Sequence, residues 1–189
     1  MILRRAARRL KAGVDRILGR NTLAARLPGI ALGREVIVLG ENKFTYGKNC
    51  FIDVRAYLNC AGGLWNDYRG HIAMGDNCEI GPYSVLHGAG GITLGNGVHL
   101  GPHCVLYAHT LQRDRENPEA PPVMNFAPIV LEDGVMVGSN VAISFGVRIG
   151  RNSIIAPGSS VVSDIPPNSY AAGSPARVFM VAAKKESAG

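Results

Sequence analysis

The chain contains no long apolar run, and this absence removes several functional classes. Its 189 residues include no stretch of eighteen or more apolar residues, so no membrane-spanning helix is predicted. The N-terminal region also lacks an uninterrupted apolar stretch followed by a small-residue cleavage site, so no secretory signal is predicted. We therefore expect a protein of the cytoplasm.

Cysteine is scarce, and its spacing does not suggest a site. Cys50, Cys60, Cys78 and Cys104 include no C-x-x-C pair, which argues against a zinc knuckle and against a redox motif. The sequence instead predicts free, buried thiols that fill space in a core.

Acidic charge is scarce at the start of the chain. Residues 1–29 hold eight Lys or Arg and one Asp, a net charge of +7, whereas the whole chain has a formal charge of +6, which leaves −1 for the remainder. The body is therefore nearly neutral, and a broad phosphate-binding face is not predicted for it. Aromatic residues are not interleaved with the basic run, so we do not expect nucleic-acid binding.

The basic N-terminal segment, residues 1–28, has the pattern of an amphipathic helix. Its apolar side holds Ile2, Leu3, Ala6, Leu10, Val14, Ile17 and Leu18, and its basic side holds Arg4, Arg5, Arg8, Lys11 and Arg16. Such a helix can lie on an anionic membrane through residues 1–20. It can equally pack on the domain or on a neighbouring subunit, and an organellar targeting peptide is a third alternative.

A six-residue period runs through most of the remaining chain. Large apolar residues recur at one phase of it: Tyr46, Ile52, Leu58, Met74, Ile80, Leu86, Leu94, Leu100, Leu106, Leu131, Val137, Ile143, Ile149, Ile155 and Val161. Glycine follows seven of them. Neither a helical period nor simple strand alternation explains glycine at that phase.

The period fits a chain that winds as a triangular coil, with a short strand and a corner in each hexad. The apolar residue then points inward, and glycine follows it because the corner backbone is crowded and can require a positive φ. The residue two positions earlier also points inward and must be small or β-branched. That position holds Cys50, Cys78, Ser84, Val98, Cys104, Val135, Val141, Val147, Ser153 and Ser159.

Three passages carry a resemblance to a known family: "CEIGPYSVLHGAGGITLGNGVHLGPH", "APIVLEDGVMVGSNVAISFGVRIGRNSIIAPGSSVV" and "AAGSPARVF". The segment from about residue 74 to 179 resembles the hexapeptide-repeat acyltransferases, especially the sugar and polysaccharide O-acetyltransferases related to maltose and galactoside acetyltransferases. The resemblance implies an all-β fold, a left-handed parallel β-helix of about five coils, assembled as a homotrimer. We expect this domain over residues 29–175, with the N-terminal amphipathic helix before it and a tail at 176–189.

Three interruptions break the repeat, at residues 60–72, 87–91 and 108–128. Interruptions of a repeat usually form loops on one face, often the binding face. The longest is rich in proline and charge, and we expect it to protrude as a functional loop or as an arm that packs on a neighbouring subunit. In similar enzymes this loop helps to wall a cleft between two protomers.

Acyl transfer from a thioester to a hydroxyl needs a base, and histidine suits that role because its ordinary pKa lies near neutrality. Similar enzymes begin the long loop with a stretch such as "YAHNH", in which the second histidine is the base. Here residues 107–111 read "YAHTL", so the expected position is Leu111, which cannot accept a proton. Three alternatives remain open: His109 serves after a shift of register, His87 serves instead, or the chain keeps the scaffold without the activity.

Similar enzymes bind coenzyme A along the C-terminal coils through backbone groups and small side chains. The matching positions are Gly138, Ser139, Ser144, Ala156, Gly158, Ser163 and Arg177. The lysine that the family often carries near Ser163 is absent, so Arg177, or else Lys184 or Lys185, is the expected partner of a ribose phosphate.

No metal is expected. The γ-class carbonic anhydrases share the expected fold and bind zinc through histidines, but the spacing of His99 and His103 does not match that arrangement.

The sequence thus favours a cytoplasmic O-acetyltransferase that transfers an acetyl group from acetyl-CoA to a hydroxyl of a sugar or glycan. The acceptor is a lipid-linked saccharide if the basic helix contacts the inner membrane face. The alternative is a non-catalytic trimeric β-helix scaffold or binding protein that retains the coenzyme A slot.

Overall fold

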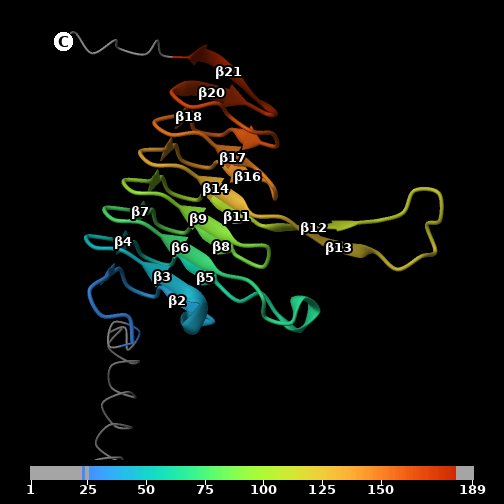
Figure 1. Ribbon diagram of the computed structural model, residues 1–189, viewed down its shortest axis with the longest axis horizontal. Coiled ribbons are helices and arrows are strands. Elements are labelled where there is room, and N and C mark those ends of the chain that lie inside the picture. The colour runs from blue at the N-terminus through green and yellow to red at the C-terminus, as the bar shows by residue number, and fades with distance from the viewer. Residues whose placement is uncertain (1–22, 24–25, 182–189) are drawn as a thin grey trace, which may run out of the picture.

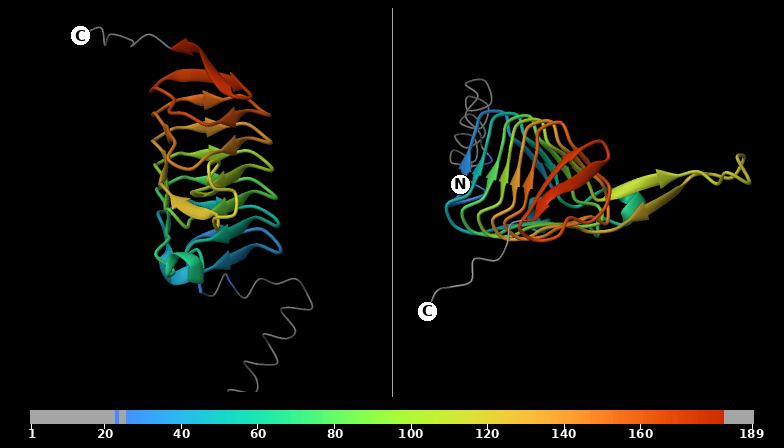
Figure 2. Two further views of the ribbon diagram at one scale, coloured as in Figure 1. Left: turned by 90° about the vertical axis from the view of Figure 1, so that its right-hand side faces the viewer. Right: turned by 90° about the horizontal axis from the view of Figure 1, so that it is seen from above.

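Along most of the chain, strands that follow one another belong to different sheets, and every third strand returns to the same sheet. The computed structural model describes Leu23 and residues 26–181. The expected helix over residues 1–20 and the lysines Lys184 and Lys185 lie outside the described residues. Within them the chain winds as a stack of triangular coils (Figures 1 and 2).

Three sheets form the sides of this prism. Sheet A contains β1 (Ala31–Leu32), β4 (Phe51–Ile52), β7 (Glu79–Ile80), β10 (His99–Leu100), β15 (Met136–Val137), β18 (Ile154–Ile155), β20 (Ser169–Gly173) and β21 (Ala176–Val181). Sheet B contains β2 (Ile37–Leu39), β5 (Tyr57–Asn59), β8 (Val85–His87), β11 (Val105–Tyr107), β16 (Ala142–Ile143) and β19 (Ser160–Val161). Sheet C contains β3 (Phe44–Tyr46), β6 (Ile72–Met74), β9 (Ile92–Leu94), β14 (Ile129–Leu131) and β17 (Arg148–Ile149).

Short elements outside these sheets lie in the connections from sheet B to sheet C. They are the antiparallel hairpin of β12 (His109–Gln112) and β13 (Val123–Phe126), and the 3-10 turns η2 (Glu41–Lys43) and η3 (Leu64–Asn66). The hairpin lies within the expected loop over 108–128 and projects far from the prism (Figure 1). Within the described residues no helix has the length and apolar content needed to span a membrane.

The strands pair in parallel and in register from coil to coil. In sheet A, Ile52 pairs with Ile80, Ile80 with Leu100, and Leu100 with Val137. Equivalent positions of successive hexads therefore stack directly on one another along the axis. The last pair departs from this rule, because β21 runs antiparallel to β20 and places residues 176–181 of the expected tail in sheet A.

The inward positions predicted by the six-residue period are confirmed. Every large apolar residue of the predicted phase is buried except Tyr46, which packs partly buried against the core. All ten small or β-branched residues of the second phase are buried as well. The polar members of this set bond to backbone carbonyls, as Cys78 Sγ does to Gly95 O at 2.9 Å and Ser153 Oγ to Pro166 O at 2.8 Å.

The glycine that follows seven of these apolar residues is explained by close stacking of the coils and not by a positive φ. A Cβ added at Gly81 would lie 2.6 Å from the carbonyl carbon of Gly101 in the next coil, so close stacking requires glycine there. Its φ is not positive. Positive φ instead falls two residues later in the same turn, at Tyr83 (58°), a position that other coils fill with residues such as His103 and Asn140.

Candidate functional site

All three interruptions of the repeat leave the prism at the same corner. Each follows a strand of sheet B (β5, β8 or β11) and returns to a strand of sheet C. We call this edge, with residues 60–71, 88–91 and 108–128, the loop corner. The views along and across the axis both show η3 and the β12–β13 hairpin projecting from it (Figures 1 and 2).

The loop corner brings together the two histidines that the sequence left as alternatives. His87 ends β8, and His109 begins β12 one coil further along the chain. Their ring centroids are 4.6 Å apart. Tyr107 pairs in register with His87, and its ring stacks on that imidazole at 5.4 Å. The register of β8 and β11 therefore places His109, two residues after Tyr107, close to His87.

An indole ring covers both imidazoles. Trp65, in η3, lies 5.6 Å from His87 and 5.0 Å from His109, between ring centroids. It also stacks on Phe126 of β13 at 5.7 Å, with the planes inclined by 10°. The sequence analysis missed Trp65 and Phe126. The signal that could have found them is the shared phase of the interruptions, which predicts that the three loops leave from one edge.

The position of Trp65 is set by its neighbour Asn66, whose side chain is buried. The Asn66 amide nitrogen donates to Ala61 O at 3.2 Å and to Ala89 O at 3.0 Å. Its Oδ1 accepts from the backbone nitrogens of Gly63 and Tyr68, at 2.9 and 3.1 Å. One side chain thus closes its own loop and joins it to the 88–91 loop, which holds Trp65 over the histidines.

A second buried asparagine contacts His87 directly. Asn59, which ends β5, lies one coil below His87 in sheet B and pairs with it in register. Its amide nitrogen is 3.1 Å from His87 Nε2, and its Oδ1 accepts a hydrogen bond from Gly62 N at 3.0 Å.

The environment of the pair favours neutral imidazoles. Burial lowers the pKa of His87, and the charge that His109 would carry lowers this pKa further. Burial also lowers the pKa of His109. Within the described residues the Nδ1 atoms of both rings are buried and lack a hydrogen-bond partner. Nε2 is therefore the nitrogen of His109 that can reach a substrate.

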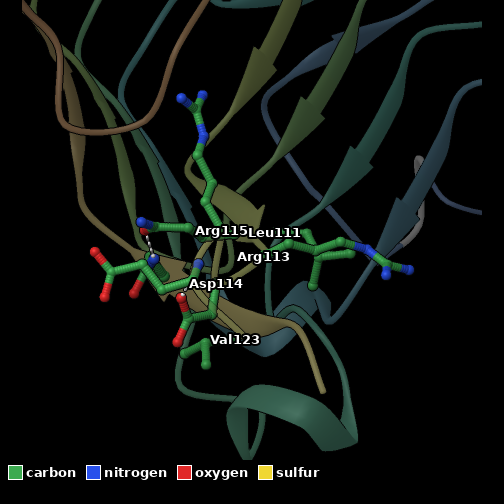
Figure 3. Close-up of a pocket in the computed structure, with 8 residues that line it drawn as sticks. Leu111, Arg113, Asp114, Arg115 and Val123 are labelled. Carbon is green, nitrogen blue, oxygen red and sulfur yellow. Dashed lines mark hydrogen bonds between the residues drawn. The ribbon is translucent and has the colours of Figure 1, made fainter. Parts of the chain in front are cut away.

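Leu111, the position at which similar enzymes carry the base, lies away from this cluster on the hairpin. It pairs with Met124 across β12 and β13, and it is 58% exposed. It lines an open hollow of about 890 Å³ beside the hairpin (Figure 3). The lining of this hollow is Leu111, Gln112, Arg113, Asp114, Arg115, Glu116, Val123 and Asn125, and it includes neither histidine.

The residues expected to hold coenzyme A divide between two edges of sheet B. Gly138, Ser139, Ala156 and Gly158 lie in turns that join sheet A to sheet B, and Arg177 is exposed on β21 beyond them. Ser144 and Ser163 instead follow β16 and β19 at the corner between sheets B and C. The two serines therefore lie in line with the loop corner along the axis. The other five positions lie at the opposite edge of sheet B.

Coil stacking explains one of these positions without a ligand. A Cβ at Gly138 would lie 2.6 Å from the nitrogen of Pro157, so the next coil already requires glycine there. Gly158 has no atom within 4 Å of such a Cβ, and its φ of 73° is that of a turn. Ser144, Ser163 and Arg177 are partly or fully exposed and remain available to a ligand.

His99, His103 and the cysteines lie in other surroundings, whereas His71 lies in the loop corner, with its ring beside Gly91. His99 in sheet A contacts Glu79 at 3.4 Å, and His103 stacks on Tyr83 at 5.0 Å in a different turn. No group of three metal-ligating side chains occurs in the part of the chain that the structure describes. All four cysteines are free and buried, as predicted, and burial raises the pKa of Cys60 to about 12.

The comparisons with known proteins agree with this architecture. The model of the "hexapeptide repeat of succinyl-transferase" matches residues 72–108 and 128–163, on either side of the hairpin. Galactoside O-acetyltransferase of Escherichia coli is 37% identical over 136 residues, which cover 72% of this chain. The chain spans 56% of the length of that relative.

Solved structures share the fold at lower identity. AntD, an N-acyltransferase from Bacillus cereus, was solved as its S84T mutant in complex with dTDP and coenzyme A; it superposes with a TM-score of 0.73 at 17% identity over 87% of this chain and 90% of its own. A maltose O-acetyltransferase from Clostridium difficile gives a TM-score of 0.55 at 23% identity, over 82% of this chain and 67% of its own.

Proposed function

We propose that this chain, whose hexapeptide repeat and sequence are similar to those of acyltransferases, transfers an acetyl group from acetyl-CoA to a hydroxyl of a sugar or glycan. The observation that carries the proposal is the imidazole pair at the loop corner, with ring centroids 4.6 Å apart. The galactoside O-acetyltransferase relative favours a sugar hydroxyl as the acceptor.

His109 acts as the general base in this proposal. Its lowered pKa keeps the imidazole neutral at pH 7, and its Nδ1 is buried, so Nε2 takes the hydroxyl proton. As the proton leaves, the hydroxyl oxygen attacks the thioester carbon and the C–S bond breaks. The imidazolium then returns the proton to the departing sulfur, which leaves a free thiol and an acetyl ester.

Acetyl-CoA supplies the acyl group, and exposed small residues at the same corner, in the coils that follow His109, fit it. Ser144 and Ser163 follow the loop corner along the axis from His109, and their hydroxyls suit the amides of a pantetheine arm. Arg177 is exposed and fits a phosphate, since a guanidinium binds phosphate oxygens in pairs.

The division of these residues between two edges of sheet B supports a homotrimer. A coenzyme A slot between two protomers, lined by one edge of sheet B from each, would bring the two serines and the other five positions together. Sheet A also exposes a ladder of apolar side chains, in which Met136, Ile154, Tyr170 and Met180 pair in sequence and are each more than two fifths exposed. Such a stripe is typical of a surface that a second subunit covers. Light scattering would give three times the monomer mass, and a monomer would contradict this assembly.

The test of the reaction is thiol release from acetyl-CoA with a panel of sugars. We expect turnover with at least one sugar and a fall in kcat of about 100-fold or more in His109→Ala, because a positioned base contributes that much. His99→Ala is the matched control, since His99 lies on the same coil outside the cluster, and it should leave kcat unchanged. Full turnover in His109→Ala would remove the assignment of the base.

A non-catalytic scaffold or binding protein is the second candidate, and Leu111 favours it, because similar enzymes carry their base at that position. Calorimetry distinguishes the two. Coenzyme A binding without turnover on any sugar of the panel would support the scaffold, whereas binding with turnover supports the enzyme.

We also propose a cytoplasmic protein whose residues 1–20 contact an anionic membrane, with a lipid-linked saccharide as acceptor. Support comes from the sequence alone, through the basic amphipathic pattern of that segment. Deletion of residues 2–20 should abolish binding to anionic liposomes. Unchanged liposome binding and unchanged activity on lipid-linked acceptors would contradict this proposal.

A further inference from the structure

The hydrogen bonds around Asn59 determine which of the two histidines can take a proton. The backbone nitrogen of Gly62 is a donor, and it lies 3.0 Å from one atom of the Asn59 amide. That atom must be Oδ1, because an amide NH₂ group cannot accept a hydrogen bond from the Gly62 nitrogen. The other atom of the amide, 3.1 Å from His87 Nε2, is therefore the NH₂ group.

An NH₂ group facing Nε2 requires a lone pair on Nε2. With a proton there, two donors would face each other at 3.1 Å in a buried place, because the Asn59 side chain is only 8% exposed. Neutral His87 must then carry its proton on Nδ1. The imidazolium form is disfavoured for the same reason, since it carries a proton on both nitrogens.

We propose that Asn59 is a positioning residue that holds His87 as the Nδ1–H tautomer with its Nε2 occupied, and so leaves His109 as the only base of the pair. The catalytic consequence rests on the proposed function, but the tautomer itself does not. It also answers the question that the sequence left open between His87 and His109, because the only lone pair of His87 is already bonded.

His87 Nδ1 is buried and has no hydrogen-bond partner among the described residues, so this tautomer leaves one buried N–H unpaired. The Nε2–H tautomer would leave more groups unpaired, namely the Nδ1 lone pair, the Nε2 proton and an Asn59 amide hydrogen. The titratable groups that face the His87 ring are His109 at 4.6 Å and the Tyr107 phenol ring at 5.4 Å, and Trp65 covers it at 5.6 Å. A charge on His109 lowers the pKa of His87. Proton uptake by His109 during turnover therefore further disfavours protonation of His87.

The experiment is a long-range nitrogen–proton NMR correlation of the imidazole rings in the full chain, which identifies the protonated nitrogen of each neutral histidine. In the wild-type protein we expect His87 with Nδ1 protonated and Nε2 unprotonated. A wild-type His87 with its proton on Nε2 would overturn the proposal. This measurement needs no variant and no turnover, so its result is independent of whether the protein is an enzyme.

Asn59→Asp provides the second arm. A carboxylate accepts where the amide donated, so we expect the proton of His87 to move to Nε2 and its pKa to rise. Asn152→Asp is the matched control, because Asn152 makes the same kind of side-chain bond, to Asn168 at 3.3 Å, at another corner. It should leave the spectrum of His87 unchanged. A neutral His87 that keeps its proton on Nδ1 and none on Nε2 in a folded Asn59→Asp protein would also overturn the proposal.

Discussion

Two kinds of corner occur in this prism, and they differ in what their residues do. The turns from sheet C to sheet A and from sheet A to sheet B are short and alike, with a residue at positive φ in the third position, such as Asn77 (56°) or His103 (58°). The loop corner instead carries three insertions of different length. The turns at the first two corners repeat one backbone conformation that lets the coils stack. The loop corner carries the histidines, Trp65 and the hairpin.

The difference shows how a repetitive scaffold acquires a site. Because the strands pair in parallel and in register, the strands of one sheet end at the same edge. Side chains near these strand ends therefore lie together although they are far apart in the sequence. His87 and His109 are brought together in this way. Stability should therefore depend mostly on the interior of the coils and activity on the loop corner, and the following changes test that division.

The largest loss of stability is expected from the interior. Leu86, fully buried in β8, precedes the loop corner but points into the core. Leu86→Ala should lower the free energy of unfolding by about 2–5 kcal/mol, because it removes buried methyl groups and leaves a cavity. Urea denaturation measures this. Val85→Ala, on the outward side of the same strand, should cost about 1 kcal/mol or less. Equal losses for the two would mean that the interior is not the source of stability.

A smaller loss is expected from the anchor of the loop corner. Asn66→Ala removes four hydrogen bonds and should cost about 1–3 kcal/mol, because Gly63 N and the carbonyl oxygen of buried Ala89 lose their side-chain partner, whereas Ala61 O and Tyr68 N keep a backbone bond. Trp65, the one tryptophan of the chain, should shift its fluorescence to longer wavelength as it leaves the imidazoles. Asn117→Ala, on the exposed hairpin, should change neither quantity. An unchanged spectrum in Asn66→Ala would show that something else holds the indole.

The pH dependence of stability should come in part from the loop corner. His87 and His109 have lowered pKa values in the folded protein, so below about pH 6.5 the unfolded chain takes up protons that the folded chain does not. Their contribution is complete above that pH and is lost as the pH falls through the folded pKa values. Denaturation midpoints between pH 7.5 and about 5.0 should decline less steeply in a His87→Asn, His109→Asn double variant. An identical slope would contradict the burial of these rings.

The smallest effect is expected on the outer face of sheet C. Arg148 bonds Glu132 at 2.7 Å, and this pair keeps the pKa of Glu132 below its ordinary value. Because the pair is exposed to solvent, Arg148→Met should cost about 1 kcal/mol or less, and less still in about 1 M salt. A loss comparable to that of Leu86→Ala would mean that surface charge, rather than core packing, holds the coils together.

The sequence predicted the interior of the fold and only part of the site. The inward phases were predictable because each position repeats every six residues and only certain sizes fit there. Trp65, Phe126 and the two asparagines were not predicted, because the six-residue period indicates only that the loops leave from one edge and not which of their residues meet there. The hairpin within 108–128 was expected only as a protruding loop, because its pairing depends on a turn of ten residues without a repeated pattern.

By itself the sequence determined the stacked parallel strands, the buried thiols and the single edge from which loops could leave, because steric fit in a crowded coil acts identically at every repeat. Only the tertiary structure decided that His87 and His109 lie together, that Trp65 covers them and that Asn59 occupies one of their nitrogens. These contacts join residues 22 to 44 positions apart in the sequence. The physical reason is strand register, because coils of unequal length bring such residues to the same level only after the strands have paired.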